Sequence, residues 1–230
     1  MIDGPLSVEE LEVLRVIPTP AVSNAIETLD VRPRNAGYMG PEVRQMFPAL
    51  APVIGYAVTA CTVSVHKPGL EGPASRADYW RYVEASGPRP LVAVVADLDN
   101  PPVIGAFFGE VNANIHRALG CVGAITNSGI RDMDEVEAFG FPIWAGVVVV
   151  SHAYVHLVDF DTPVLVGGLL VKPGDLLLAD RHGVIQIPLE IARDIPEAVR
   201  RVEVREQTII RYCQSPDFGA DGLADLVARL

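Results

Sequence analysis

Apolar residues follow two different periodicities along this chain. Nearly continuous apolar runs, rich in β-branched residues, predict buried strands at residues 52–65, 89–98, 121–126, 142–151, 163–171, 175–180 and 183–188. Apolar residues at helical spacing predict helices at 7–16, 19–29, 75–86, 109–120 and 133–140, and from 189 onward with an interruption at Pro196. Strands and helices alternate in the middle and strands dominate afterwards, so the pattern predicts an α/β protein with a mixed sheet.

The 230 residues are predicted to form a single domain. No Ser/Gly/Pro-rich tract divides the chain, and neither an internal repeat nor a low-complexity segment is present in the sequence. Half of the residues are hydrophobic, which is enough for a substantial buried core.

Charge and cysteine content narrow the class of protein. The net charge is −11, with 29 acidic residues against 18 Lys and Arg, which argues against a nucleic-acid partner. The first residues, MIDGPLSVEELEVL, lack the basic start and apolar core of a signal peptide, and apolar runs such as 143–150 are too short to cross a bilayer. Three cysteines without metal-binding spacing fit a reducing compartment. We therefore expect a cytoplasmic protein without a membrane partner.

An Arg–Asp pair, Arg131 and Asp132, follows the predicted strand 121–126 and the turn TNSG. Ligands of open α/β sheets usually bind beyond the carboxyl ends of the strands. The planar guanidinium of Arg131 matches a carboxylate, and Asp132 offers the hard oxygen that Mg²⁺ and Mn²⁺ prefer. A small keto acid needs such a pair. The alternative is that the two residues only cap the following helix.

The surrounding sequence resembles a known family. The run FFGEVNANIHRALGCVGAITNSGIRD (107–132) is similar to RraA-like proteins and 4-hydroxy-4-methyl-2-oxoglutarate aldolases, whose pattern ends in Asp-Gly-x-x-Arg-Asp. Three further segments resemble the family in the correct order: TPAVSNAIETL (19–29), VIGYAVTACT (53–62) and TPVLVGGLLVKPGDLLLADRHGVIQIP (162–188). Together the four segments cover most of the chain.

The resemblance implies a fold and an activity. The fold would be a single compact domain of the swivelling β/β/α type, with mixed sheets flanked by helices. The activity would be that of a class II pyruvate aldolase, which cleaves a 4-hydroxy-2-oxo acid, decarboxylates oxaloacetate, or both. Mg²⁺ or Mn²⁺ would stabilise the enolate that becomes pyruvate. The resemblance also implies a homotrimer or hexamer, with active sites between subunits and the C-terminal segment, about 189–230, packed on a neighbouring subunit.

The resemblance also implies roles for individual residues. Arg131 would bind the pyruvyl carboxylate, and Asp132 would coordinate the metal directly. Glu110 would hold the metal through a water. The main-chain N–H groups of Val111 and Asn112 would receive the substrate's carboxylate or enolate.

A carboxylate near the C-terminus can reach a neighbouring subunit's site in this family. Glu206, in VREQTII, is the candidate here and Glu203 its rival, while an exposed acid on an amphipathic helix is the alternative for both.

The chain departs from the family pattern at three positions. Asn127 and Ser128 stand where the family usually has Asp-Gly, and Asn24 replaces an Asp in the N-terminal helix. Asn127 keeps its polarity and is expected to contact substrate. The lost charges are expected to change metal affinity or substrate choice.

Histidines and the family's other members leave different functions open. The Ser-His-Ala at His152 is similar to the phosphohistidine loop of swivelling domains, although the chain has no P-loop or room for an ATP-binding domain. His152 could instead line the substrate pocket. His156 lies four residues later, a metal-ligand spacing only if the segment is helical. RraA-type proteins can also act without catalysis, as protein inhibitors of an RNA-degrading enzyme.

Overall fold

A long strand, β2, is the centre of the fold in the computed structural model, which describes residues 4–69, 74–100 and 104–230. The main sheet of the described residues has the order β1-β7-β5-β3-β2-β12-β13, and β9 also pairs with β2. Its strands are β1 (Arg44–Gln45), β2 (Val53–Val63), β3 (Leu91–Asp97), β5 (Cys121–Thr126), β7 (Ile143–Ala145), β9 (His156–Phe160), β12 (Leu176–Asp180) and β13 (Gly183–Ile187). β2, β3, β5 and β7 are parallel, and the others pair antiparallel, so the sheet is mixed as predicted.

Both faces of the central strands are covered, which explains their unbroken apolar sequence. All seven residues of β3 are buried. On β2, Tyr56, Val58 and Ala60 belong to one hydrophobic cluster, whereas Ala57 and Cys61 belong to another on the opposite face. The first cluster packs against helices and the second against a β-hairpin, which gives three layers: hairpin, sheet and helices.

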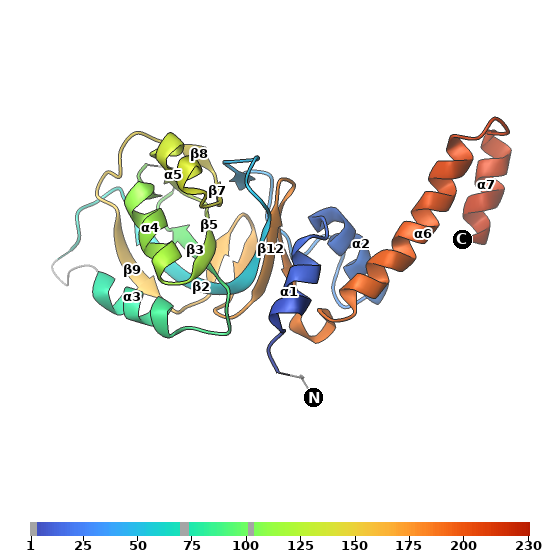
Figure 1. The fold of residues 1–230 in the computed structure, drawn as a ribbon. Coiled ribbons are helices and arrows are strands. Elements are labelled where there is room, and N and C mark those ends of the chain that lie inside the picture. Colours follow the sequence, from blue (N-terminus) through green and yellow to red (C-terminus); the bar gives the residue numbers. More distant parts are fainter. Residues whose placement is uncertain (1–3, 70–73, 101–103) are drawn as a thin grey trace.

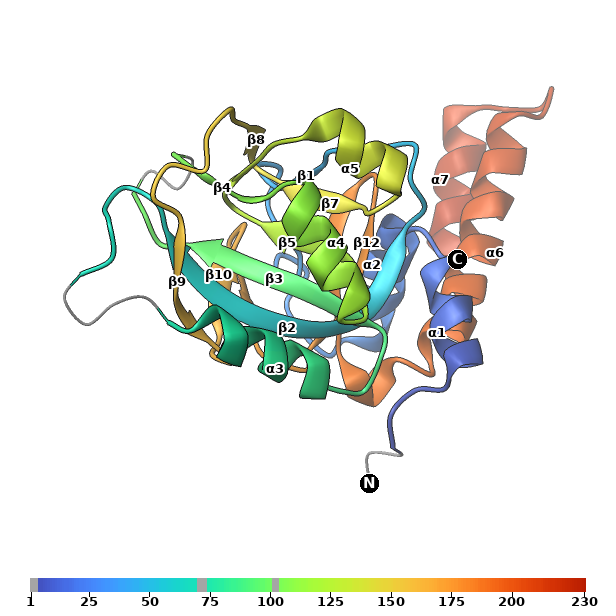
Figure 2. The same ribbon diagram turned by 60° about the vertical axis from the view of Figure 1, so that its left-hand side comes forward.

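The helices lie mainly on one side of the sheet and at one end of it (Figures 1 and 2). They are α1 (Val8–Arg15), α2 (Thr19–Leu29), α3 (Arg76–Ala85), α4 (Glu110–Ala118), α5 (Met133–Phe139), α6 (Ile195–Cys213) and α7 (Ala220–Arg229), with a 3-10 turn η1 (Leu189–Ile191). α1 begins with a capping box formed by Ser7 and Glu10. The family's β/β/α arrangement is therefore present, as predicted.

Several short strands complete the fold. β4 (Ala106–Phe108), β6 (Gly129–Ile130) and β8 (Val147–Val148) form a small parallel sheet, and β10 (Val164–Val166) and β11 (Leu169–Val171) form the hairpin. The predicted strand 142–151 is thus divided between β7 and β8, which belong to different sheets. Gly146 separates them, and a Cβ there would lie 3.1 Å from the main-chain oxygen of Asn127.

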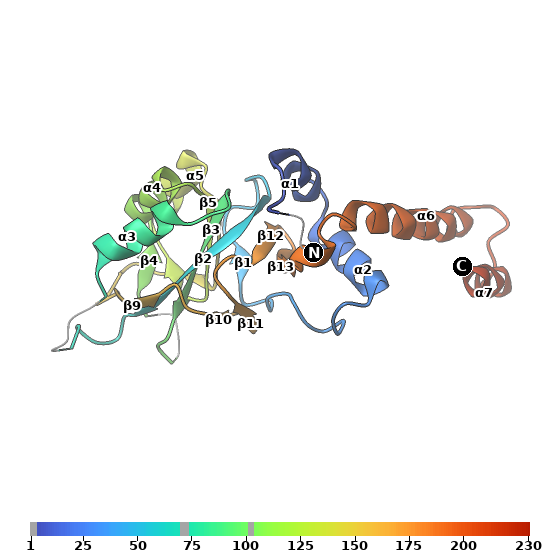
Figure 3. The same cartoon turned by 90° about the horizontal axis from the view of Figure 1, so that it is seen from below.

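The C-terminal helices leave the body of the domain (Figures 1 and 3). The sequence predicted that Pro196 interrupts the C-terminal helix, and this is wrong. Pro196 stands in the first turn of α6, where a missing N–H costs nothing. The buried residues of α6 are Ile195, Ala198 and Val199, all in its first two turns, and the helix contacts α2 and α1. Its far half lies beside α7, which has no buried residue. We call residues 204–230, which comprise the far half of α6, the connection that follows it and α7, the arm.

None of the described helices combines the length and the apolar composition that crossing a bilayer requires.

Candidate functional site

A cleft of about 630 Å³ opens at the end of the sheet where α4 begins. Its walls come from β4, the first turns of α3 and α4, the Arg131–Asp132 pair, and the loop before β9. The lining residues used below are Arg76, Trp80, Phe107, Gly109, Val111, Asn112, Ile115, Arg131, Asp132, His152, Tyr154, Val155 and His156. The structure therefore brings five of the predicted residues together: Arg131, Asp132, Val111, Asn112 and His152.

Asp132 is held in an unusual conformation beside α4. Its backbone is left-handed, with φ 55° and ψ 51°, which is uncommon for a residue other than Gly and often marks a functional site. Its Oδ2 accepts a hydrogen bond from the main-chain N–H of Glu110 at 3.0 Å, and its Oδ1 lies 3.4 Å from Nε of Arg131. Asp132 stands at the N-cap position of α5, but its side chain makes no capping bond there. The carboxylate serves α4 instead.

Gly109 makes this approach feasible. A Cβ at that position would lie 2.5 Å from Oδ2 of Asp132, closer than non-bonded atoms come. Gly109 is extended, with φ −161°, so the requirement is for space rather than for a special backbone angle. Glycine at position 109 therefore has a steric reason.

The start of α4 presents main-chain donors to the cleft. The first N–H groups of a helix have no partner within it. In α4, Asp132 accepts a hydrogen bond from the first of these groups, the N–H of Glu110, and from no other among the described residues. The N–H groups of Val111 and Asn112 stay available, and the Val111 side chain is 70% exposed. The side-chain amide of Asn112 donates to the Phe107 carbonyl and so does not compete for these main-chain groups. The Glu110 side chain is exposed and does not line the cleft in this chain.

A buried histidine supports the base of α4. His116 is fully buried, and burial lowers its pKa to about 4, with the carbonyl of Asn112 acting weakly in the opposite direction. Nδ1 lies 2.6 Å from that carbonyl, which can only accept, so Nδ1 carries the hydrogen. Nε2 then accepts from the Tyr79 hydroxyl at 2.8 Å. This neutral histidine joins α4 to α3 beneath the cleft, a structural role that the sequence did not suggest.

The loop before β9 forms the opposite wall. His152 is exposed, and its Nδ1 lies 3.3 Å from the Ala153 carbonyl. His156 is the first residue of β9, and its Nδ1 lies 2.8 Å from the Tyr154 carbonyl. The segment is not helical, so the two histidines do not share a helix face, although both line the cleft.

Asn127 and Ser128 lie outside this cleft and organise the strand ends behind it. Oδ1 of Asn127 accepts from the main-chain N–H of Asp97 at 2.7 Å, and Nδ2 donates to the Asp97 carbonyl at 3.0 Å. The Ser128 hydroxyl lies 3.0 Å from Oδ2 of Asp97 and 2.7 Å from the Gly105 carbonyl. Burial raises the pKa of Asp97, while the hydrogen bonds that its carboxylate accepts from the Asp99 N–H and the Ser128 hydroxyl act to lower it. Both departures from the family pattern thus have structural partners.

Glu206 lies far from the cleft within one chain. Its Oε1 accepts from the Asn24 side chain at 3.1 Å, in a second hollow of about 670 Å³ between α2 and α6. Glu203 is exposed and does not line that hollow. Asn24, the third departure from the family pattern, is thus the partner of the trans-subunit candidate.

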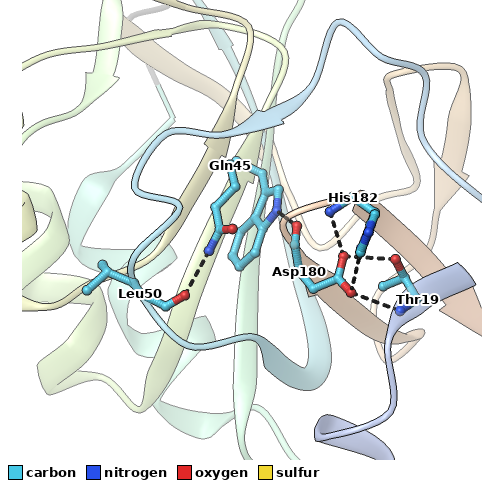
Figure 4. Close-up of polar contacts among 6 residues, drawn as sticks. Thr19, Gln45, Leu50, Asp180 and His182 are labelled. Atoms are coloured by element: carbon cyan, nitrogen blue, oxygen red, sulfur yellow. Dashed lines mark hydrogen bonds and ion pairs between the residues drawn. The ribbon is translucent and has the colours of Figure 1, made fainter.

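A buried polar network fixes α2 to the sheet (Figure 4). Asp180, at the end of β12, accepts from the N–H of Thr19 at 2.9 Å, from the Thr19 hydroxyl at 2.8 Å and from the N–H of His182 at 2.7 Å. Burial acts to raise the pKa of Asp180, but these hydrogen bonds outweigh it, and the pKa is lowered. The Asp180 carbonyl accepts from the Trp144 indole at 2.8 Å. Asp180 was not predicted as a key residue. The sequence marks it only by the Asp-x-x-Gly motif of residues 180–183.

Known proteins share this fold and family. The chain belongs to the RraA-like family, since a profile of that family, described as Aldolase/RraA, matches residues 19–186. It is 27% identical over 109 residues to a Halalkalibacterium halodurans protein named "Putative 4-hydroxy-4-methyl-2-oxoglutarate aldolase". That match covers 45% of this chain and 52% of the relative, so it spans about half of the relative's length.

Two solved structures resemble nearly the whole chain. An uncharacterized protein from Pseudomonas syringae has a TM-score of 0.72 and 20% identity, covering 99% of this chain and 96% of its own. Streptomyces coelicolor RraAS2, described as an unusual member of the RNase ES inhibitor RraA protein family, has a TM-score of 0.67 and 21% identity, covering 89% and 97%. At these identities the likeness shows the fold.

Proposed function

We propose that this protein is a divalent-metal-dependent carbon–carbon lyase that releases pyruvate from a 4-hydroxy-2-oxo acid or from oxaloacetate. The observation that carries the proposal is the position of Asp132 and Arg131. Both side chains are about one-third exposed at the edge of a cleft, and Asp132 is fixed to the start of α4. The aldolase name of the Halalkalibacterium relative supports the same chemistry.

Arg131 and α4 are the proposed anion site. The Arg131 guanidinium has donors beyond Nε for a planar carboxylate. The free N–H groups of Val111 and Asn112, with the positive end of the helix dipole, suit an oxygen that gains negative charge when the carbon–carbon bond breaks. These donors are fixed before substrate binds, so no reorganisation is needed during reaction.

Asp132 is suited to an ion that is held by few protein ligands. Among the described residues no group of three or more His, Cys, Asp or Glu side chains could hold an ion. Mg²⁺ is commonly held by one or two carboxylates with waters and substrate oxygens in its remaining positions, which suits Asp132. Glu110, whose main-chain N–H bonds Asp132, is the proposed second carboxylate, and its exposed side chain would turn towards the cleft to hold the ion through a water. Mn²⁺ prefers the same oxygen donors. When bound, such an ion supplies Lewis acidity at the 2-oxo group.

His152 is the proposed general base for retro-aldol cleavage and not for decarboxylation. Retro-aldol cleavage requires a proton to leave the 4-hydroxyl while the electrons of the broken bond move to the pyruvyl unit. Because Nδ1 of His152 faces a carbonyl, Nε2 is the nitrogen with a free lone pair. Decarboxylation of oxaloacetate has no hydroxyl proton to remove. His152→Ala should therefore reduce aldol cleavage about 100-fold and decarboxylation much less.

The deciding experiment is pyruvate release from oxaloacetate and from 4-hydroxy-4-methyl-2-oxoglutarate, with Mg²⁺, with Mn²⁺ and with EDTA. We expect turnover that needs metal and disappears in Arg131→Ala and in Asp132→Ala. Folding of each variant is checked by circular dichroism. Turnover that survives EDTA, or that survives either substitution, would refute this proposal.

We also propose that the chain works as a homo-oligomer in which the arm packs on a neighbouring subunit. α7 is ten residues long, and an isolated helix of that length is marginal in water. The arm carries exposed apolar side chains, among them Val204, Phe218 and Val227. Light scattering should find a trimer or hexamer for the full chain and smaller species after removal of residues 215–230. Glu206→Gln then tests whether this carboxylate acts in a neighbour's site.

A protein-binding regulator is the second candidate function. The same exposed arm favours it, and the name of RraAS2 as a member of an RNase-inhibitor family is consistent with it. Inhibition of an RNase E-type enzyme by the full chain, lost when residues 215–230 are removed and unaffected by Asp132→Ala, would support regulation over catalysis.

A further inference from the structure

The cleft is larger than the pyruvyl unit that Arg131 and Asp132 would hold. A pyruvyl unit has about the volume of three or four waters, roughly 100 Å³ at about 30 Å³ for each water. The cleft measures about 630 Å³. Most of it is therefore left for the rest of the substrate, and its lining should describe that remaining part.

The wall that α3 contributes carries two unused hydrogen-bond donors. Arg76 and Trp80 are four residues apart on α3, so they lie on the same face of the helix. Neither the Arg76 guanidinium nor the Trp80 indole N–H has a hydrogen-bond or ion-pair partner in the described ranges 4–69, 74–100 and 104–230. Trp80 is half-buried against the core, so its ring is held in place.

Arg81 on the same helix shows how a surface arginine behaves here. Its Nη1 lies 2.6 Å from Oδ1 of Asp78, and it does not line the cleft. Arg76 has no such partner among the residues that the structure describes, and it lines the cleft. An unpaired guanidinium at a cleft wall is suited to a planar carboxylate from a ligand.

Many of the other side chains that line the cleft are apolar. Phe107 and Ile115 line the cleft from β4 and α4, and Val155 lines it from the loop before β9. An acid group bound there would lose its hydration without gaining partners. Arg76 and Arg131 are the permanently cationic side chains among these lining residues, so they are the places for the ligand's carboxylates, which a carbon spacer would connect.

We propose that Arg76 and Trp80 form a distal subsite that selects the non-pyruvyl end of the substrate. This inference rests on the proposed function of the cleft. Arg76 would bind a terminal carboxylate, and Trp80 would cover the adjoining spacer with its ring and donate from its indole N–H. The preferred substrates are then 2-oxo diacids whose spacer is long enough to connect the two arginines, ahead of short diacids and monoacids.

Ligand binding can be followed through Trp80 itself. The chain has two tryptophans, and Trp144 is fully buried, with its indole N–H bonded to the Asp180 carbonyl. A ligand in the cleft should therefore change the emission of Trp80 alone. Trp80→Phe is the control that removes the signal.

The test is a set of dissociation constants with Mn²⁺ present, measured by calorimetry and by Trp80 emission. The probes are oxalate, a series of 2-oxo diacids from oxaloacetate to 2-oxoadipate, and 2-oxo monoacids of matching length. The proteins are the wild type, Arg76→Ala, Arg76→Lys, Arg131→Ala and the control Arg81→Ala. Arg76→Ala should weaken the tightest-binding diacid by about 10- to 100-fold, the equivalent of one charged hydrogen-bonded pair, and leave oxalate and monoacids unchanged.

The two proposals fail differently. Equal affinity of wild type and Arg76→Ala for every diacid, or equal losses for diacids and monoacids, would overturn the distal subsite. Affinity for oxalate that does not depend on Arg131 would overturn the pyruvyl site, whatever Arg76 does. Arg76→Lys should recover part of the lost diacid affinity, because Lys keeps the charge but loses the planar fork.

Discussion

The carboxylate of Asp132 accepts a hydrogen bond from the main-chain N–H of Glu110 at 3.0 Å, across 22 positions of the sequence. This bond joins the loop that follows β6 to the first turn of α4. It places the proposed metal ligand beside the unpaired N–H groups that would receive the substrate's charge. The 22 positions that separate Glu110 from Asp132 thus connect the two halves of one site, the start of α4 and the Arg131–Asp132 pair.

Substituting Asp132 separates its structural and chemical roles. Asp132→Asn keeps an oxygen acceptor for the Glu110 N–H, so stability should stay within about 1 kcal/mol of wild type. The amide is a poor ligand for Mg²⁺, so pyruvate release should fall by 100-fold or more. Asp132→Ala should lose both. Urea unfolding and the pyruvate assay, run on the same preparations, distinguish the two roles; equal stability of Ala and Asn variants would show that the capping bond contributes nothing.

Gly109→Ala should damage the site without touching a polar group. The new methyl would lie 2.5 Å from Oδ2 of Asp132, so the carboxylate or the start of α4 must move. We expect a loss of 10- to 100-fold in activity and about 1–3 kcal/mol in stability. Gly87→Ala is the matched control, because a Cβ there meets nothing within 4 Å. Wild-type activity in Gly109→Ala would show that the approach is looser than described.

His116 should make stability depend on pH. Its pKa is about 4 in the folded protein and 6.5 ordinarily, because burial disfavours the charged ring. Between these values the unfolded chain binds the extra proton, so stability is complete above pH 6.5 and declines as pH falls towards 4, by roughly 3 kcal/mol in total. His116→Gln removes the titration and should flatten this part of the profile. Urea unfolding at several pH values checks it, and an unchanged slope in the variant would assign the effect elsewhere.

Thr19→Val tests the anchorage of α2. Val matches the shape of Thr but removes the hydroxyl that donates to Oδ1 of Asp180 at 2.8 Å, so this buried oxygen keeps only the His182 N–H of its two partners among the described residues. The expected cost is about 1–3 kcal/mol in the free energy of unfolding. Thr19→Ser keeps the hydroxyl and should cost less than half as much. Equal losses in the two variants would mean that the methyl group, not the hydrogen bond, matters.

Asn127→Asp restores the family's usual residue and should destabilise this chain. The amide both accepts from and donates to the main chain of Asp97, and a carboxylate cannot donate. It would face the Asp97 carbonyl with like polarity, at an expected cost of about 1–3 kcal/mol. Thermal unfolding measures it. If activity with metal rose in this variant instead, Asn127 would belong to the functional site after all.

Local sequence could predict the long elements and the chemical pair. The apolar runs of β2 and β3 predict buried strands. Arg131 and Asp132 are neighbours in sequence, and their position follows from the strand before them. β4, β6 and β9 were not predicted, because segments of two to five residues hold too little periodicity.

The rest of the site depends on distant contacts. Asn127 was expected at the substrate, but its partners are main-chain groups of Asp97, 30 positions away, which no local pattern reveals. Arg76 and Trp80 are brought to the cleft by the packing of α3, and nothing in the sequence around them indicates a ligand. Pro196 was misplaced because a proline that interrupts a helix and one that opens a helix look alike in sequence.

β2 has one further consequence, for how this protein can change over evolutionary time. One edge of the strand pairs with β3, and the other is shared between β12, which carries the anchor of α2, and β9, which begins at the cleft. Losing or gaining one residue in β2 would exchange its buried faces on both sides at once. The loop before β9 can vary in length and the arm can be extended or removed, so new specificities should arise there while β2 keeps a constant length.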